Sequence, residues 1–138
     1  MSTPIHASAV AIGGRGVLIL GPSGSGKSDL ALRLIDRGAI LISDDYTVLT
    51  VSGSGLRARP PDNIAGKIEV RGIGITPVAF TVNIEVALAV TLVPSVERMP
   101  HPACWTHEGV TVPLVSIAPF EGSAPIKVEL ALKHGIAP

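Results

Sequence analysis

The residues best suited to chemistry form one short segment near the start of the chain. It has the G-x-x-x-x-G-K-[ST] pattern of a phosphate-binding loop and consists of Gly21, Pro22, Ser23, Gly24, Ser25, Gly26, Lys27 and Ser28. In such a loop, backbone N–H groups and the positive end of a helix dipole hold an anionic phosphate. The lysine reaches the outer phosphates, and the serine hydroxyl is offered to Mg²⁺. The segment therefore predicts a site for a nucleotide phosphate and Mg²⁺.

The segments on either side of this loop support that prediction. Residues 17–20 form an apolar run that is typical of a buried strand. Residues 29–35 have apolar side chains at helical spacing, and Gly38 is a suitable C-terminal stop for the helix. A chance glycine-serine turn is the competing interpretation, but it would not need a strand before it and a helix after it.

Two adjacent carboxylates follow the next expected strand, residues 39–42. Asp44 and Asp45 then lie at the carboxyl end of a strand, the edge where ligands bind in α/β folds. Neighbouring residues there point to different sides, so one acid can face a metal while the other faces a phosphoryl acceptor. Paired acids at a strand end are also common in solvated turns and helix caps. Their position beside a phosphate loop favours the chemical role.

The rest of the chain predicts further strands and one more helix. A hairpin over residues 5–20 puts His6 one strand away from the phosphates, and a hairpin over residues 47–59 is expected at the periphery. The remaining expected elements are a glycine-interrupted strand within 67–75, a central strand at 86–93, a strand at 110–117 and a helix at 126–133.

Length and composition restrict the function further. The 138 residues suffice for one compact domain, so we expect a single domain over 1–138 on which any protein substrate must dock. Eleven basic and eleven acidic residues balance, which gives no global attraction to nucleic acid or anionic lipid. No apolar run approaches about 18 residues and no signal core follows the N-terminus, which predicts a cytoplasmic protein. Cys104 is the single cysteine and cannot form an internal disulfide.

Three motifs in order, GPSGSGKS, RGAILISDD and IEVRGIGI, give the chain a strong family resemblance. Together they resemble the C-terminal catalytic domain of HPr kinase/phosphorylase, the bacterial enzyme that phosphorylates a serine of the phosphocarrier protein HPr. The resemblance runs from His6 to about Leu132 and implies an α/β domain with a mixed β-sheet, the P-loop fold shared with phosphoenolpyruvate carboxykinase. Because the family's usual N-terminal domain is missing, the chain resembles the short form found in some proteobacteria.

The resemblance also implies roles for individual residues. Asp45 would take the proton from the acceptor serine, and Lys27 would hold the β and γ phosphates of ATP. Mg²⁺ would be held by Ser28 and Glu69, with support from Asp44. His6 matches the family's catalytic histidine, although a lone histidine in a strand is more often structural.

Two arginines are further candidates. Arg98 resembles the family's catalytic arginine in position and would then stabilise charge on the transferring phosphoryl group, whereas the alternative is a solvated loop arginine. Arg71 lies within IEVRGIGI and could pair with Glu69 or Asp45.

The reaction implied is Mg²⁺-dependent transfer of the ATP γ-phosphoryl to HPr, in control of the phosphotransferase system and carbon metabolism. Reverse phosphorolysis is less firmly implied, because residues 118–125 lack the basic residues that longer members carry. A homo-oligomer is also implied, with a hexamer as the family's assembly. Two alternatives stay open: a P-loop small-molecule kinase or NTPase, and a non-catalytic nucleotide-sensing module.

Overall fold

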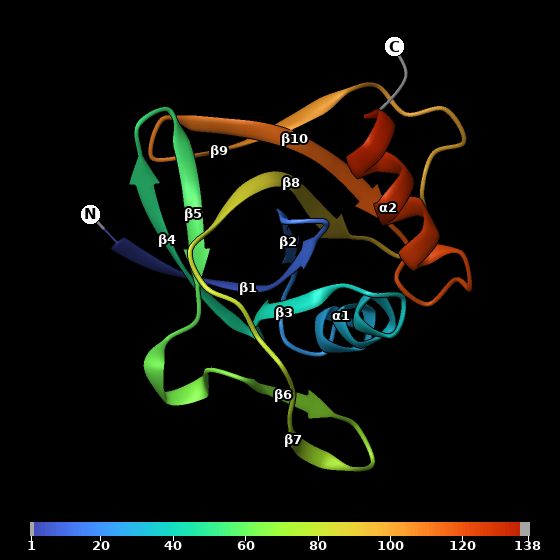
Figure 1. Ribbon diagram of the computed structural model, residues 1–138. Helices are drawn as coiled ribbons and strands as arrows, with labels where there is room; N and C mark the ends of the chain where they lie inside the picture. The colour runs from blue at the N-terminus through green and yellow to red at the C-terminus, as the bar shows by residue number, and fades with distance from the viewer. Residues whose placement is uncertain (1, 136–138) are drawn as a thin grey trace.

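Residues 2–135, which the computed structural model describes, form a mixed α/β fold with ten strands, two α-helices and a short 3₁₀ helix (Figure 1). The first half contains β1 (Ser2–Ile12), β2 (Arg15–Leu20), α1 (Lys27–Asp36), β3 (Ile40–Ser43), β4 (Tyr46–Ser52), β5 (Gly55–Arg59) and η1 (Asp62–Ile64). The second half contains β6 (Lys67–Val70), β7 (Gly74–Pro77), β8 (Ile84–Leu92), β9 (Ala103–His107), β10 (Val110–Ile117) and α2 (Ala124–His134). Every element expected from the sequence is present, except that the single strand expected within 67–75 is a hairpin of β6 and β7. Strand β9 and the short helix η1 are additional.

Five strands of the main sheet close into a ring. Strand β1 lies between β2 and β4, β4 pairs with β5, and β8 pairs with both β5 and β2. The β2–β8 pair is parallel, and β8 also pairs in parallel with β10, which carries β9 at the edge. A Cβ at Gly16 would lie 2.8 Å from the Glu85 carbonyl oxygen, so glycine lets β2 approach β8. Strand β8 is therefore central, as the sequence predicted.

Strand β1 changes partner along its length. Its first half, up to His6, pairs with β4, and Ala9 to Ala11 pair with β3. Strands β3 and β4 thus follow one another along the same edge of β1, and Asp44 and Asp45 form the break between them. The two acids therefore sit where the ladder of backbone hydrogen bonds is interrupted.

The alternation of side chains along the strands divides the core in two. Val10, Val17 and Ile19 face the helices and pack with Leu30 and Leu34 of α1. The opposite faces meet inside the ring in a second cluster, formed by Ala9, Ala11, Leu18, Ile42, Leu49, Leu56, Ala58, Val86, Ala89 and Val112. The expectation that the 47–59 hairpin is peripheral was wrong, because the ring needs β4 and β5 to close and their inner side chains are buried.

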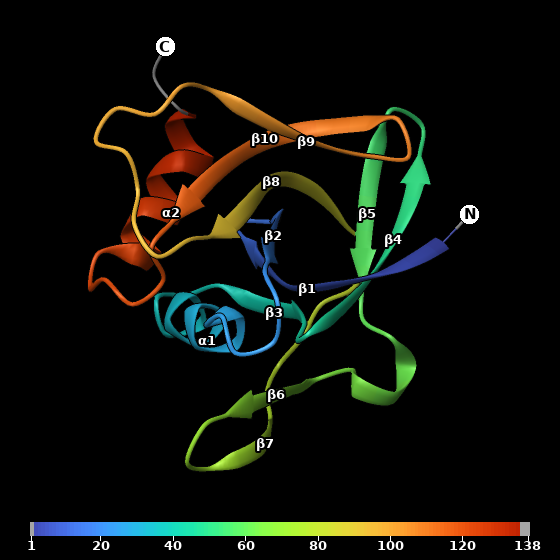
Figure 2. The same ribbon diagram turned by 180° about the vertical axis from the view of Figure 1, so that it is seen from behind.

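Both helices lie on one side of the sheet, as Figures 1 and 2 show from opposite directions. Helix α1 ends at Asp36 with Arg37 as its C-cap, and Gly38 follows with a φ of 111°. The Arg37 guanidinium bonds Glu129 of α2, and this hydrogen bond and charge raise the pKa of Arg37 above its usual value. Neither helix in the described part of the chain has the length and hydropathy that crossing a membrane requires.

The β6–β7 hairpin forms a separate two-stranded sheet beside α1 (Figure 2). Ile68 is its buried residue and joins the core that faces the helices. The glycines in IEVRGIGI, which interrupt the strand pattern in the sequence, make the hairpin turn: Gly72 and Gly74 both have positive φ. Ile73 and Ile75 of the same motif are exposed.

Candidate active site

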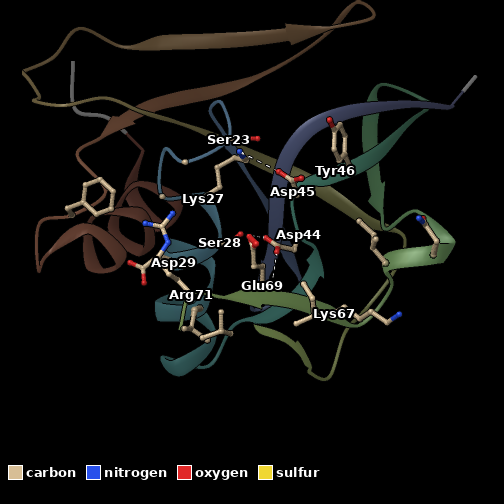
Figure 3. Close-up of a pocket in the computed structure, with 18 residues that line it drawn as sticks. Ser23, Lys27, Ser28, Asp29, Asp44, Asp45, Tyr46, Lys67, Glu69 and Arg71 are labelled. Atoms are coloured by element: carbon tan, nitrogen blue, oxygen red, sulfur yellow. Dashed lines mark hydrogen bonds and ion pairs between the residues drawn. The ribbon is translucent and has the colours of Figure 1, made fainter. Parts of the chain in front are cut away.

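A cavity of about 860 Å³ opens beside the phosphate loop. Its lining comes from segments far apart in the sequence: the loop, the β3–β4 break, the β6–β7 hairpin and Phe120. Figure 3 shows the polar side chains of these segments converging on this space. A cavity of this size fits a small-molecule ligand or cofactor.

The phosphate loop joins β2 to α1 as the sequence predicted. Gly26 adopts a left-handed backbone with φ 102°, and α1 begins at Lys27 directly after it. The first N–H groups of a helix have no partner within the helix, so those of α1 are available to an anion at this point. A Cβ at Gly26 would also lie 3.2 Å from the Phe120 ring, which is a second reason for glycine there.

Lys27 is buried although it carries a charged group. Only 5% of the residue is exposed, and Nζ donates to the Pro22 carbonyl oxygen at 3.0 Å. Nζ also lies 3.7 Å from Asp45 Oδ1 and 3.3 Å from His6 Nε2. A buried cation beside the opening of the loop is placed to meet phosphate oxygens.

Asp45 and His6 form a directly bonded pair. His6 Nε2 lies 2.8 Å from Asp45 Oδ1, and because a carboxylate only accepts hydrogen bonds, Nε2 carries the proton in this contact. The His6 ring stacks on Tyr46 with centroids 4.9 Å apart. Half of the Asp45 side chain is exposed, and within residues 2–135 no hydrogen bond engages Oδ2. The pair thus fixes one carboxylate oxygen and leaves the other for a ligand.

Asp44 has the opposite environment. Only 6% of it is exposed, and its carboxylate accepts three hydrogen bonds. Oδ1 accepts from Ser28 Oγ at 2.6 Å and from Ser8 Oγ at 2.9 Å, while Oδ2 accepts from the Glu69 backbone N–H at 3.0 Å. The two acids therefore face different sides, as predicted, and Asp44 ties α1, β1 and β6 together.

The oxygen donors near the phosphate loop suit a hard cation such as Mg²⁺. Ser28 donates its proton to Asp44, so the lone pairs of its hydroxyl oxygen are free to bind a cation. Glu69 lines the same cavity (Figure 3). The described residues contain no cluster of three or more His, Cys, Asp or Glu side chains arranged for a metal. Mg²⁺ usually takes only one or two protein carboxylates and completes its shell with water and phosphate.

The two candidate arginines occupy different places. Arg71 lines the cavity from the β6–β7 turn, but among residues 2–135 no ion pair joins it to Glu69 or Asp45. Arg98 lies on the exposed segment between β8 and β9 and does not line the cavity. The structure thus brings together all the candidate site residues near the loop except Arg98.

Three residues around the site escaped the sequence analysis: Ser8, Tyr46 and Phe120. Ser8 lies two residues after His6 on β1, so the period of a strand puts it on the same face, and that spacing was the available signal. Tyr46 directly follows the acid pair. No sequence pattern near Phe120 indicates a site residue, because the path of the loop between β10 and α2 brings it to the cavity.

Comparison with known proteins decides the family. Residues 1–93 match the model of the HPr serine kinase C-terminal domain. The chain belongs to this family. The match spans the phosphate loop, the β3–β4 break and the β6–β7 hairpin, and it includes every residue that lines the cavity except Phe120.

Individual relatives agree with this family. The HPr kinase/phosphorylase of Chlorobium limicola is 34% identical over 135 residues, which cover 85% of this chain and 40% of that protein. The HPr kinase/phosphorylase of Caldicellulosiruptor bescii is 47% identical over 74 residues, covering 53% of this chain and 24% of that protein. The chain thus spans well under half the length of these curated relatives.

A solved structure extends the similarity to the fold. The HPr(Ser) kinase/phosphatase from Coxiella burnetii matches with a TM-score of 0.82 and 31% sequence identity, covering 95% of this chain and 94% of that one. The agreement therefore includes α2 and β10, which lie beyond the residues that the family model matches.

Proposed function

We propose that this chain is an ATP-dependent serine kinase domain that phosphorylates the phosphocarrier protein HPr. The observation that carries the proposal is the Asp45 carboxylate, which is held at Oδ1 by His6 and lies 3.7 Å from the buried Lys27 ammonium at the phosphate loop. Membership of the HPr serine kinase family supplies the acceptor. This arrangement puts a proton acceptor next to a site for the outer phosphates of ATP.

Asp45 has the features that a base for a serine hydroxyl requires. Its half-exposed carboxylate can reach an incoming hydroxyl, and His6 and Lys27 orient it from the other side. The serine O–H proton passes to Asp45 Oδ2 as the serine oxygen bonds the γ-phosphorus, and the bond from that phosphorus to the bridging oxygen of ADP breaks. Positioned proton transfer of this kind accelerates a reaction by about 10²- to 10⁴-fold.

Lys27, Ser28, Asp44 and Glu69 complete the proposed machinery. The Lys27 ammonium neutralises charge on the β and γ phosphates. Ser28 and Glu69 would hold Mg²⁺, with Asp44 fixing the Ser28 hydroxyl at 2.6 Å. A Mg²⁺ ion held by these residues would supply positive charge that offsets the negative charge of the phosphate oxygens. A role for Arg98 would need its loop to approach the cavity from the position that it has here.

Phosphorolysis, the reverse reaction with inorganic phosphate, is the weaker part of the proposal. Phe120 of the loop before α2 lines the cavity, and residues 118–125 carry no basic side chain to attract a second phosphate. We also expect a homo-oligomer, with a hexamer as the assembly that the family resemblance implies, and a cytoplasmic location beside its substrates. Light scattering of the purified protein measures the assembly directly.

The test is incubation of the protein with HPr, ATP and Mg²⁺, followed by mass spectrometry of HPr for phosphoserine. We expect transfer that EDTA abolishes. Asp45→Asn should lower the rate by about 10²- to 10⁴-fold, because the amide cannot accept the serine proton. Asp36→Asn is the matched control, since Asp36 is an exposed acid at the end of α1 outside the cavity.

Three outcomes would contradict the proposal in different ways. Transfer by Asp45→Asn at the wild-type rate would remove the proposed base. ATP turnover that ignores HPr would instead indicate a small-molecule kinase or NTPase. Tight nucleotide binding without turnover or phosphoserine would indicate a nucleotide sensor.

A further inference from the structure

Ser8 lies opposite the break between β3 and β4, where β1 changes partner. On β1, His6 pairs with Tyr46 of β4 and Ala9 pairs with Ser43 of β3, where the register shifts between Ala9 and Val10. Asp44 and Asp45 lie between these two registers, and the Asp44 carbonyl accepts a hydrogen bond from the Tyr46 N–H in a tight turn. The pairing of β1 with β3 and β4 therefore leaves the Asp45 N–H without a backbone carbonyl of a neighbouring strand as its acceptor.

The Ser8 hydroxyl fills this gap with two hydrogen bonds. Its oxygen accepts from the Asp45 N–H at 3.0 Å, and its proton goes to Asp44 Oδ1 at 2.9 Å. Ser8 is fully buried, so water does not compete for either bond. One hydroxyl thus contacts the backbone of one acid and the side chain of the other.

We propose that Ser8 is a positioning residue that holds both carboxylates of the site in their working orientations. The inference rests on the proposed function of Asp45 and adds a residue that does not itself touch a substrate. Asp45 has a φ of 69°, a left-handed conformation that is unfavourable for a residue other than glycine. The bond from its N–H to Ser8 stabilises this conformation, and the conformation directs the carboxylate toward His6 and Lys27.

The second bond acts on the proposed metal side. Asp44 Oδ1 accepts from Ser8 and Ser28 together, so the Ser8 hydroxyl helps to fix the carboxylate that orients the Ser28 hydroxyl. Removing the Ser8 oxygen leaves the Asp45 N–H without its acceptor and the buried Asp44 carboxylate without one of its three donors. Each acid is then held by one hydrogen bond fewer, although no group that contacts a substrate has changed.

Ser8→Ala is the direct test because it removes one atom and creates almost no cavity. We expect kcat for phosphoryl transfer to HPr to fall roughly 10- to 100-fold, with KM for ATP within about threefold of the wild-type value, since the phosphate loop is intact. Thr47→Val is the matched control. The Thr47 hydroxyl is equally buried on the adjacent strand but bonds the Ala7 carbonyl and neither acid.

Amide hydrogen exchange measured by NMR gives a readout that does not require activity. In Ser8→Ala the Asp45 amide should exchange at least about tenfold faster than in the wild type, because its acceptor is gone, while Thr47→Val leaves it unchanged. This measurement decides the positioning role even if the wild-type protein transfers no phosphoryl group, an outcome that would refute only the proposed function.

Three results would overturn the inference: a wild-type kcat in Ser8→Ala, an unchanged exchange rate of the Asp45 amide, or an equal loss of kcat in Thr47→Val. An equal loss in Thr47→Val would show that removing any buried hydroxyl between β1 and β4 lowers kcat through a general loss of stability, with no specific role for Ser8. A rise in KM for ATP that accounts for the whole loss would place the effect of Ser8 on nucleotide binding instead.

Discussion

The cavity has two walls that are built in different ways. We call one the loop wall, consisting of residues 21–28 with His6, Asp44 and Asp45, and the other the hairpin wall, consisting of residues 67–77. The loop wall is held by buried polar contacts: Asp44 accepts three hydrogen bonds, and Lys27 is 5% exposed. The hairpin wall has one buried residue, Ile68, and its turn carries Ile73 at 79% exposure.

The difference in burial and hydrogen bonding matches the role that we propose for each wall. Reacting groups must stay within a fraction of an ångström of their working positions, which requires several bonds to each. The hairpin wall instead exposes Ile73 and Ile75, and Ile75 also lines the cavity at which the proposed protein acceptor would bind. Substitutions in the two walls should therefore affect different measured quantities.

The largest effect is expected at Lys27 in the loop wall. Lys27→Ala removes the cation beside Asp45 and the proposed phosphate site, so the rate of transfer to HPr should fall by on the order of 10³-fold. Lys67→Ala changes the same residue type in the hairpin wall, where the side chain is exposed, and should cost less than about tenfold. Steady-state assays on both variants test this, and equal losses would show that the walls do not differ in function.

The next effect is on stability and concerns the anchor of the hairpin wall. Ile68→Ala removes a fully buried side chain and should lower the free energy of unfolding by about 2–4 kcal/mol. Ile73→Ala in the same hairpin should change it by less than about 0.5 kcal/mol, because that side chain is already in water. Urea unfolding of both variants gives the comparison, and similar losses would mean that the turn packs more tightly than it does here.

The smallest effect separates the two acids within the loop wall. Asp44→Asn puts an amide NH₂ against a hydrogen-bond donor, which should lower the free energy of unfolding by about 1–3 kcal/mol. Asp45→Asn should change it by less than about 0.5 kcal/mol, since that side chain is half exposed. If chemical denaturation finds the two variants equally stable, the three bonds to Asp44 do not contribute as proposed.

Much of the site could be predicted because it depends on local patterns. The phosphate loop, the helix after it and the glycine-turned strand of IEVRGIGI each follow from residues close together in the sequence. The position of Asp44 and Asp45 at a strand end was also predicted and is confirmed. Periodicity and turn chemistry act over a few residues, so the sequence contains them directly.

The misses all depend on contacts between distant residues. The 47–59 hairpin looked peripheral because nothing within it shows that β5 will pair with β8 and close the ring. Strand β9 has a weak pattern and forms at the edge by pairing with β10. The catalytic role of Arg98 is a different case and stays a prediction, with its loop outside the cavity lining in this structure.

The sequence by itself determined that this chain has a phosphate loop on a strand–helix junction, two acids near it and the motifs of the HPr serine kinase family. Only the tertiary structure decided which acid is buried and which is open to a ligand. Asp44 and Asp45 are chemically identical neighbours, and local rules cannot distinguish them. The distinction comes from β1, whose change of partner puts Ser8 and His6 opposite the two acids.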